Sequence, residues 1–267
     1  MSLAFRNGRT VSRETVRIAP DDAGFLFGDG LFETLRVNEG IALDVQAHLD
    51  RLLAGLSRVE IEIPERREEL EHAVKVVAGE APRPVARLRI TITRGGAEGP
   101  TRLITTAGYD PPSEERYREG VAVLLLAGLR IDSQGPLAGL KTLSHQMNRI
   151  ALRRAEAESC FEALLLNEKG LLAEGSRSNI ALALPEGIYT PRLSDGCLPG
   201  TVRRRLLEKG AFAERSISRS DLERASGIVL MNSLFGVLPV GQVNGIAVSN
   251  CAELGQRLRR ALQALCA

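Results

Sequence analysis

A polar segment with two consecutive prolines, Tyr109–Glu119 (YDPPSEERYRE), interrupts the apolar patterning of this chain near its middle. Proline lacks a backbone N–H, and clusters of proline and polar residues end helices and strands. The 267 residues of the chain are enough for two modest domains, one on either side of this segment. We therefore predict an N-terminal domain over residues 1–110, a linker over residues 111–119 and a C-terminal domain over residues 120–267.

The first half of the chain alternates strand and helix patterns. It opens with a hairpin signal at Asn7-Gly8, a favoured tight turn. Segment 25–43 (FLFGDGLFETLRVNEGIAL) contains apolar runs broken by glycine, and we predict two strands joined by a turn there. After it, apolar periodicity predicts helices at Val45–Val59 and Glu65–Ala78 and strands at Val85–Thr93 and Leu103–Ala107.

The second half mixes strands and helices without a strict βαβ rhythm. The sequence contains no GxGxxG or GxxxxGKS phosphate loop. These features exclude a doubly wound nucleotide-binding fold and predict a two-domain α/β (α+β) protein. The predicted strands are Val121–Leu126, Ala163–Leu166, Asn179–Leu184 and Gly227–Met231, and the predicted helices are Ser144–Glu158, Thr201–Lys209 and Glu253–Leu265.

The charge of the chain is balanced, which argues against a nucleic-acid surface. Its 35 basic residues are scattered among 33 acidic ones, and the formal net charge is only +2. The longest apolar run, Val121–Gly128, is too short to span a bilayer. The start of the sequence, MSLAFRNGRT, lacks the apolar region of a signal peptide, so we expect a cytoplasmic protein with no membrane partner.

The cysteines and histidines show no metal-site spacing. No HExxH arrangement occurs, and the cysteines lack disulfide-type spacing, so we expect reduced thiols and no metal site. The residues concerned are Cys160, Cys197, Cys251, Cys266, His48, His72 and His145.

Three segments of the second half carry candidate chemistry. Lys141 follows a glycine and precedes a predicted helix, a place where one side chain can enter a cavity. A polar loop, Leu172–Ile180 (LAEGSRSNI), leads into a strand. Gly196–Arg203 (GCLPGTVR) opens a helix, and the unpaired N–H groups of a helix start suit a phosphate. An ordinary capped helix with Pro-Gly as its entry turn is the alternative.

Taken together, these segments resemble the class-IV aminotransferase family, the fold-type IV pyridoxal-phosphate (PLP) enzymes. The matching blocks run in the family's order from about Asn7 to Val240. They are FGDGLFETLRV, HLDRL, LKTL, EGSRSNI, YTPRLSDGCLPGTVR and NSLFGVLPV. The resemblance implies an N-terminal α+β sandwich, a C-terminal pseudo-barrel, PLP in the cleft between them, and a homodimer in which the partner subunit closes the pocket.

The resemblance also assigns roles to individual residues. Lys141 falls on the catalytic lysine that holds PLP as a Schiff base and moves protons at the reacting carbon. Glu174 falls on the carboxylate that faces the pyridine nitrogen, where an anion keeps that nitrogen protonated. Arg51 matches an arginine that grips the cofactor phosphate, although a surface position on its helix is the alternative.

Further cofactor contacts follow from the same resemblance. Thr201 and Val202 match the residues that offer backbone N–H groups to the phosphate. Ser233, six residues before Pro239, matches a phosphate-binding hydroxyl residue and follows Asn232, although both residues could instead be strand-end caps. Arg177 matches a position that lies close to the cofactor ring in the family, where its side chain would meet either a substrate carboxylate or solvent. The resemblance also includes Ser178 and Leu198 among the cofactor-binding residues.

The departures from the family pattern bear on the substrate, a small amine or amino acid. Branched-chain aminotransferases carry a tyrosine five residues after the lysine, where this chain has Gln146. D-amino-acid aminotransferases carry an Arg-x-His pair in the loop after the ITRG strand, and residues 95–101 (GGAEGPT) contain none. The NSL…VLPV block is similar to aminodeoxychorismate lyases.

We therefore expect a 4-amino-4-deoxychorismate lyase of folate biosynthesis, with a branched-chain or D-amino-acid aminotransferase as the alternative. A structural or binding protein that has retained the fold is disfavoured, because Lys141, Glu174 and Arg51 occur together.

Overall fold

The computed structural model describes residues 3–264 and divides them into two compact units. The first unit contains the described part of residues 1–111 together with Leu140–His145, and the second contains Pro112–Gly139 and the described residues from Gln146 onward. The short segment around Lys141 thus packs with the N-terminal unit although it lies far along the chain.

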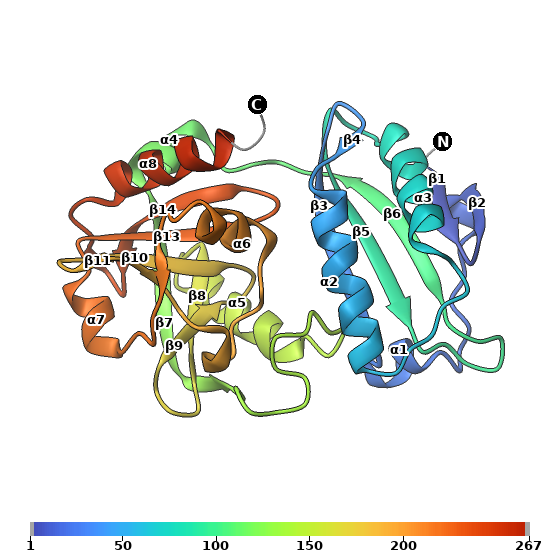
Figure 1. Cartoon of the computed structure of the whole chain (residues 1–267), viewed down its shortest axis with the longest axis horizontal. Coiled ribbons are helices and arrows are strands. Elements are labelled where there is room, and N and C mark those ends of the chain that lie inside the picture. The colour runs from blue at the N-terminus through green and yellow to red at the C-terminus, as the bar shows by residue number, and fades with distance from the viewer. Residues whose placement is uncertain (1–2, 265–267) are drawn as a thin grey trace. The chain divides into compact units, whose positions relative to one another are not determined.

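The first unit is a sandwich of one antiparallel sheet and two helices (Figure 1). Its six strands lie in the order β2-β1-β6-β5-β3-β4. Alternation along β3 and β5 sends Leu35, Val37, Leu88 and Ile90 into a core shared with leucines of helices α2 and α3. The elements are β1 (Leu3–Arg6), β2 (Arg9–Ser12), α1 (Ala23–Phe27), β3 (Gly30–Asn38), β4 (Ile41–Ala42), α2 (Val45–Arg58), α3 (Arg67–Gly79), β5 (Val85–Thr93) and β6 (Arg102–Gly108).

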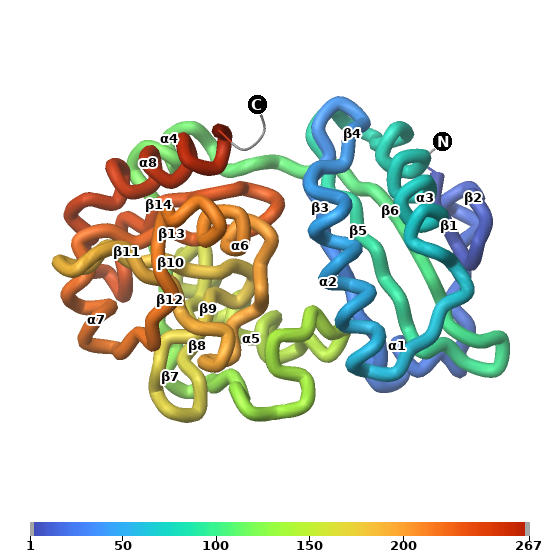
Figure 2. The backbone as a smooth tube through the Cα atoms, in the orientation of Figure 1, coloured from blue at the N-terminus to red at the C-terminus, as the bar shows by residue number. Residues whose placement is uncertain are grey.

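The second unit is built on a nine-stranded mixed sheet. Its path runs β12-β11-β10-β13-β14-β7-β8-β9, with β15 paired to β14, and β7 is parallel to both of its neighbours. The backbone trace of β7, β8 and β9 can be followed in Figure 2. The strands are β7 (Val121–Ile131), β8 (Glu162–Asn167), β9 (Leu172–Gly175), β10 (Asn179–Leu184), β11 (Gly187–Thr190), β12 (Ala213–Glu214), β13 (Gly227–Asn232), β14 (Gly236–Val243) and β15 (Ile246–Ala247).

Several helices pack against this sheet. Helix α5 packs on β7 and β8 over one apolar cluster, α8 packs on β13 and β14 over another, and α4 also packs on β14. The helices are α4 (Glu114–Glu119), α5 (Gln146–Ala157), α6 (Thr201–Glu208), α7 (Arg219–Arg224) and α8 (Cys251–Gln263). The mixed α/β class predicted from the sequence is confirmed, and most predicted helices and strands lie within a few residues of the observed ones.

The two strands predicted in segment 25–43 correspond to β3 and β4, but the start of the segment, residues 25–27, is not part of a strand. These residues form helix α1, because the carboxylate of Asp22 accepts hydrogen bonds from the N–H groups of Gly24 and Phe25 and so caps the helix start. The apolar run that favoured a strand is largely exposed: Phe25 is 72 % and Phe27 is 76 % accessible.

Two other sequence predictions need adjustment. Residues 111–119, predicted as a linker, contain helix α4, and the hydroxyl of Tyr117 donates to the carbonyl of Phe235 at 2.8 Å, which ties α4 to the second unit. The polar composition reflects a short exposed helix. The predicted C-terminal helix corresponds to α8, and its expected end at Leu265 lies outside the described residues.

Candidate active site

The segment that carries Lys141 is held along β3 by backbone hydrogen bonds. The N–H of Phe32 donates to the carbonyl of Lys141 at 2.9 Å, and the N–H of Leu143 donates to the carbonyl of Gly30 at 2.9 Å. Leu31 and Thr142 form an antiparallel bridge between these bonds. The lysine backbone therefore behaves as a short additional strand, and its position is fixed by the sheet.

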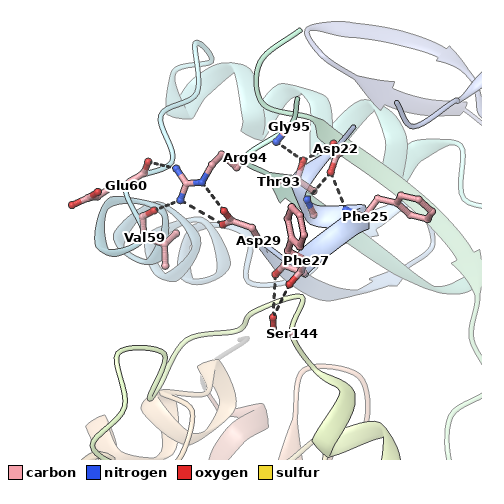
Figure 3. A network of polar contacts seen from close by, with 12 residues as sticks. Asp22, Phe25, Phe27, Asp29, Val59, Glu60, Thr93, Arg94, Gly95 and Ser144 are labelled. Atoms are coloured by element: carbon pink, nitrogen blue, oxygen red, sulfur yellow. Dashed lines mark hydrogen bonds and ion pairs between the residues drawn. The ribbon is translucent and has the colours of Figure 1, made fainter. Parts of the chain in front are cut away.

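Two glycines of the FGDGLF motif make this approach possible. A Cβ on Gly28 would lie 2.6 Å from the hydroxyl of Ser144, and a Cβ on Gly30 would lie 2.4 Å from the carbonyl oxygen of Ile92 and 2.9 Å from Leu143. Gly28 also has a φ of +72°, which favours glycine. Figure 3 shows Ser144 beneath this turn, 3.4 Å from the carbonyl of Phe27. The motif thus creates space for the lysine segment.

The side chain of Lys141 lies beside an aromatic and cationic surface. Its Nζ is 4.6 Å from the centre of the Phe32 ring, and the guanidinium carbon of Arg89 is 3.9 Å from the same centre. The ring of His145 meets Phe32 edge-on. Burial, together with the charge of Arg87, lowers the pKa of Arg89. These side chains lie on the sheet face opposite α2 and α3, and their charges suit an anionic substrate.

Sequence reasoning missed Arg89. The signal was present, because the alternation of Val85–Thr93 places Arg87, Arg89 and Thr91 on one face and Leu88 and Ile90 on the other.

Arg51 lies in a buried network rather than on a solvated helix face. Its Nε and Nη2 donate to the two carboxylate oxygens of Glu33 at 2.7 and 2.6 Å, and Glu33 also contacts Nδ1 of His48 at 2.7 Å. Arg51 is 14 % accessible, whereas Glu33 and His48 are 1 % accessible. Burial works to raise the pKa of Glu33, but the charge of Arg51 and the hydrogen bonds from His48 and Arg51 outweigh it and lower the pKa to about 2. The guanidinium of Arg51 is therefore held in one orientation.

Glu33 and His48 were not singled out from the sequence. The sequence did contain a signal for His48. His48 and Arg51 are three residues apart on α2, so their side chains lie on the same side of the helix.

In the second unit, Glu174 and Asn179 both bind the backbone of Leu198. The N–H of Leu198 donates to Oε2 of Glu174 at 2.8 Å, and the side-chain amide of Asn179 donates to the carbonyl of Leu198 at 2.8 Å. These two residues stand at the ends of the loop between β9 and β10. The loop and the segment that leads into α6 are therefore joined at Leu198.

The N-terminus of α6 has the properties of an anion site. Gly200 is its N-cap and provides no side-chain cap, and Thr201 and Val202 are the first two helical residues. No acidic residue occurs in the first turn. A Cβ on Gly200 would lie 1.9 Å from Oδ1 of Asn179, so only glycine fits there. The open N–H groups and the helix dipole favour a phosphate at this position.

The loop residues next to Glu174 have side-chain partners within the unit. The hydroxyl of Ser178 donates to Glu162 at 2.9 Å. The guanidinium of Arg177 donates to the carbonyl of Phe161 at 2.8 Å and lies 4.7 Å from the centre of that ring. Glu162 is buried, and burial raises its pKa against the opposing effects of Ser176, Arg177 and Ser178.

Asn232 acts as a strand-end cap. Its side-chain oxygen accepts hydrogen bonds from the N–H groups of Leu234 and Phe235 at 2.9 and 3.0 Å, and its amide donates to the carbonyl of Arg177 at 3.2 Å. Ser233 lies in the turn that this cap shapes between β13 and β14. The turn and the Glu174 loop are thus connected through Asn232.

The structure therefore brings the candidate residues together in two groups. The first unit holds Lys141 and Arg51, together with the unpredicted Phe32, Glu33 and Arg89. The second unit holds Glu174, Arg177, Ser178, Leu198, Thr201, Val202, Asn232 and Ser233. Each group offers chemistry that PLP requires: Lys141 of the first group has an amine that suits an aldehyde, and the second group has a carboxylate and an uncapped helix start that suits a phosphate.

Residues 30–243 match the family described as amino-transferase class IV. The chain belongs to this family. It is an enzyme of the PLP-dependent class. The chain is similar to the PLP-bound structure of a hypothetical aminotransferase from Mycobacterium tuberculosis, with 26 % identity and a TM-score of 0.84. The similarity covers 98 % of this chain and 99 % of that one.

Relatives with different activities are similarly distant. The chain is 27 % identical to a D-alanine aminotransferase of Bacillus licheniformis (96 % of this chain and 94 % of the relative) and 29 % identical to an aminodeoxychorismate lyase of Bacillus subtilis (91 % and 87 %). Among solved structures, a 4-amino-4-deoxychorismate lyase from Pseudomonas aeruginosa is 28 % identical with a TM-score of 0.84 and 98 % of both chains covered. Sequence identity to these relatives therefore does not distinguish a lyase from an aminotransferase, and the residues of the site must be used instead.

Within residues 3–264, no group of three or more His, Cys, Asp or Glu side chains is arranged to hold a metal ion. In the same part of the chain, no helix combines the length and apolar character needed to cross a membrane. Cys160, Cys197 and Cys251 are free thiols, and Cys266 lies outside the described residues.

Proposed function

We propose that this enzyme is a 4-amino-4-deoxychorismate lyase, which converts its substrate to 4-aminobenzoate and pyruvate. The observation that carries the proposal is the closed loop after β5. In D-amino-acid aminotransferases this loop provides an Arg-x-His pair for the substrate carboxylate. Here its residues, 95–101, include no basic side chain, and Arg94 just before them is engaged elsewhere.

Figure 3 shows how Arg94 is engaged. Its guanidinium donates to Asp29 at 2.6 Å and to the carbonyls of Val59 and Glu60 at 2.8 and 2.9 Å. An arginine with these three partners is held against the end of α2 and does not serve a substrate carboxylate.

The loop itself is closed by Asp22. One carboxylate oxygen of Asp22 accepts hydrogen bonds from the hydroxyls of Thr93 and Thr101 at 2.8 and 2.6 Å, so the two ends of the loop meet at one buried group. Gly96 and Gly99 form a bridge across it. This closed loop, which has no basic side chain, supports the lyase over a D-amino-acid aminotransferase.

The start of α5 provides a second argument. The first residue of α5 is Gln146, where branched-chain aminotransferases have a tyrosine. The Asn232-Ser233 turn, shaped by the cap described above, is similar to the lyase pattern. Both features support the lyase over a branched-chain aminotransferase.

The cationic surface beside Lys141 suits the proposed substrate. Aminodeoxychorismate carries two carboxylates, and Arg89 offers a guanidinium on the same sheet face as the lysine and Phe32. A partly desolvated guanidinium forms strong, paired hydrogen bonds with a carboxylate. We assign Arg89 to one of the two substrate carboxylates.

The proposal assigns each candidate residue a role towards the cofactor. Lys141 bonds the aldehyde carbon, and Glu174 faces the pyridine nitrogen. The backbone of Thr201 and Val202, the guanidinium of Arg51 and the hydroxyl of Ser233 bind the phosphate. Arg177, Ser178, Leu198 and Asn232 shape the surrounding loops.

Lys141 performs the proton transfers of the reaction. With PLP bound, the free amino group of Lys141 would remove the proton from the ring carbon that bears the substrate nitrogen. Bound PLP supplies an electron sink for the pair released at that carbon. The carbon–oxygen bond to the enolpyruvyl group breaks, the ring becomes aromatic, and the enol of pyruvate leaves and takes up a proton at its methylene carbon.

The proposal includes a cytoplasmic homodimer. Its support is an exposed apolar segment on α1, formed by Phe25, Leu26 and Phe27, since monomers rarely expose adjacent large apolar side chains. Light scattering of the purified enzyme at micromolar concentration tests this assembly, and a monomer would contradict it.

The experiment for the activity is a product assay. Purified enzyme with aminodeoxychorismate should form 4-aminobenzoate and pyruvate in equal amounts without an added keto acid. Single-turnover mixing with D-alanine or L-leucine should convert little of the cofactor to its amine form. Rapid stoichiometric conversion by either amino acid, with no 4-aminobenzoate formed, would assign an aminotransferase instead.

A further inference from the structure

Glu162 lies directly beneath the loop that joins β9 to β10. It is the first residue of β8, and its side chain is fully buried. The hydroxyl of Ser178 donates to Oε2 at 2.9 Å, and the hydroxyl of Ser176 and the backbone N–H of Ala163 donate to Oε1. The nearest charged partner is Arg177, whose Nε is 3.7 Å from Oε2. The buried carboxylate of Glu162 therefore binds the polar side chains of the short loop between β9 and β10.

The loop is pressed closely onto this carboxylate. A Cβ on Gly175 would lie 2.4 Å from the hydroxyl of Ser178 and 3.1 Å from Glu162. The N–H of Gly175 donates to the carbonyl of Ser178 at 2.7 Å, and the N–H of Ser176 donates to the carbonyl of Ala163 at 2.9 Å. The loop conformation is thus set by its contacts with β8.

Both ends of this loop act on Leu198. Glu174 at one end accepts from its N–H, and Asn179 at the other end donates to its carbonyl. Asn179 also lies against Gly200, the N-cap of α6. A shift of the loop would therefore move the Glu174 carboxylate and the start of α6 together.

We propose that Glu162 is a positioning residue of the reaction. Through Ser176 and Ser178 it fixes the loop, and through the loop it fixes the carboxylate of Glu174 and the N-terminus of α6. This inference rests on the proposed roles of Glu174 at the pyridine nitrogen and of Thr201 and Val202 at the phosphate. It assigns Glu162 no contact with substrate or cofactor.

The amide in Glu162→Gln has the same shape but only one acceptor oxygen, so one serine loses its acceptor. Leaving a buried hydroxyl without its partner destabilises the local structure. We expect PLP to dissociate from the Glu162→Gln holoenzyme about tenfold faster, the absorption band of bound PLP to shift, and kcat to fall about tenfold with KM unchanged.

Glu168→Gln is the matched control. Glu168 lies just beyond the same strand and also binds a serine, Ser133, through its hydroxyl and N–H at 2.7 and 2.9 Å. Its side chain binds Ser133 and Lys169 rather than the loop between β9 and β10, so its variant should keep the wild-type spectrum and dissociation rate.

A double-mutant cycle separates positioning from general loss of stability. If Glu162 acts through the serines, Glu162→Gln should add little to a variant that already carries Ser176→Ala and Ser178→Ala. Wild-type dissociation, spectrum and kcat in Glu162→Gln, or fully additive effects in the cycle, would overturn the proposal. Should Glu162→Gln fail to fold, Ser178→Ala alone must show the faster dissociation, and its absence overturns the proposal as well.

Glu174→Gln, measured in parallel, distinguishes this inference from the proposed role of Glu174. Faster PLP dissociation in Glu162→Gln with an unchanged spectrum in Glu174→Gln would support the link to α6 and reject Glu174 as the partner of the ring.

Discussion

The backbone carbonyl of Lys141 accepts a hydrogen bond from the N–H of Phe32, and the Nζ of Lys141 lies 4.6 Å from the centre of the Phe32 ring. One residue of β3 therefore contacts the lysine both through the backbone and through the side chain. Because the backbone bond is part of a sheet, rotation of the lysine side chain is the main freedom that remains to its amine. This arrangement is suited to a group that must return to the same position in every catalytic cycle.

Borohydride should attach PLP covalently to Lys141. The purified enzyme should be yellow, and reduction should shift its absorption band and leave the label on a single peptide. Lys169→Ala, at an exposed turn of the second unit, is the control and should be labelled as wild type is. A colourless protein that takes up no added PLP would reject the whole cofactor assignment.

Replacement of Glu174 by glutamine should lower turnover while PLP stays bound. The variant preserves the size of the side chain and its contact with Leu198 but removes the charge proposed to keep the pyridine nitrogen protonated. We expect kcat to fall on the order of a hundredfold, the scale for loss of a positioned charge. Turnover equal to wild type would show that Glu174 is not the partner of the ring.

Arg51→Ala should weaken PLP binding by about 1.5–3 kcal/mol, the usual scale for a hydrogen bond to a charged group. Ser233→Ala should cost less, because it removes a neutral donor. Equilibrium titration of the apoenzymes with PLP measures both effects. The exposed Arg66→Ala, at the start of α3, serves as a control for the loss of one positive charge. Wild-type affinity in Arg51→Ala would reject its role at the phosphate.

The Glu33 network should make stability depend on pH in the acid range. The pKa of Glu33 is lowered from 4.5 to about 2, so its ionised form stabilises the fold above pH 4.5, and this contribution is lost as the pH falls from 4.5 towards 2. Its full size is roughly 3 kcal/mol. The difference in free energy of unfolding between wild type and Glu33→Gln, from urea titrations followed by circular dichroism, should be constant above pH 5 and shrink below pH 4. A difference that does not change with pH would contradict the assignment.

Arg89→Leu should raise the KM for aminodeoxychorismate by about tenfold or more, because a carboxylate would lose a charge-assisted hydrogen bond. Arg87→Leu is the matched control, because Arg87 lies on the same strand and sheet face but is exposed, and it is Arg89 that lies over the Phe32 ring. Steady-state kinetics would separate the two variants. Equal KM values for Arg89→Leu and Arg87→Leu would remove Arg89 from the substrate site.

Periodicity predicted the elements whose burial is regular. Strand Val85–Thr93 and strand Asn179–Leu184 match the observed β5 and β10, because each has one continuous pattern of burial. Helix α1 was missed because one side chain, that of Asp22, decides its start. Strand β14 was not predicted because it contains Pro239, which removes a ladder donor, although Pro239 still pairs with Val229.

For the site, the motifs identified residues, and the structure added their partners. The resemblance pointed to Lys141, Arg51 and Glu174. Sequence patterns did not indicate Glu33 beside Arg51 or Glu162 beneath the loop, because those contacts join residues that are distant in the chain and depend on buried charge.

The Lys141 segment is synthesised after the rest of the unit with which it packs, and this order has a consequence for folding during synthesis. The edge of β3 that it covers includes the N–H of Phe32 and the carbonyl of Gly30, and both stay unpaired until residues 140–145 leave the ribosome. Open strand edges are templates for association with other chains. The nascent N-terminal half therefore has an unpaired edge on β3 that can pair with other chains. A fragment that ends at Pro111 would keep this edge unpaired and should self-associate.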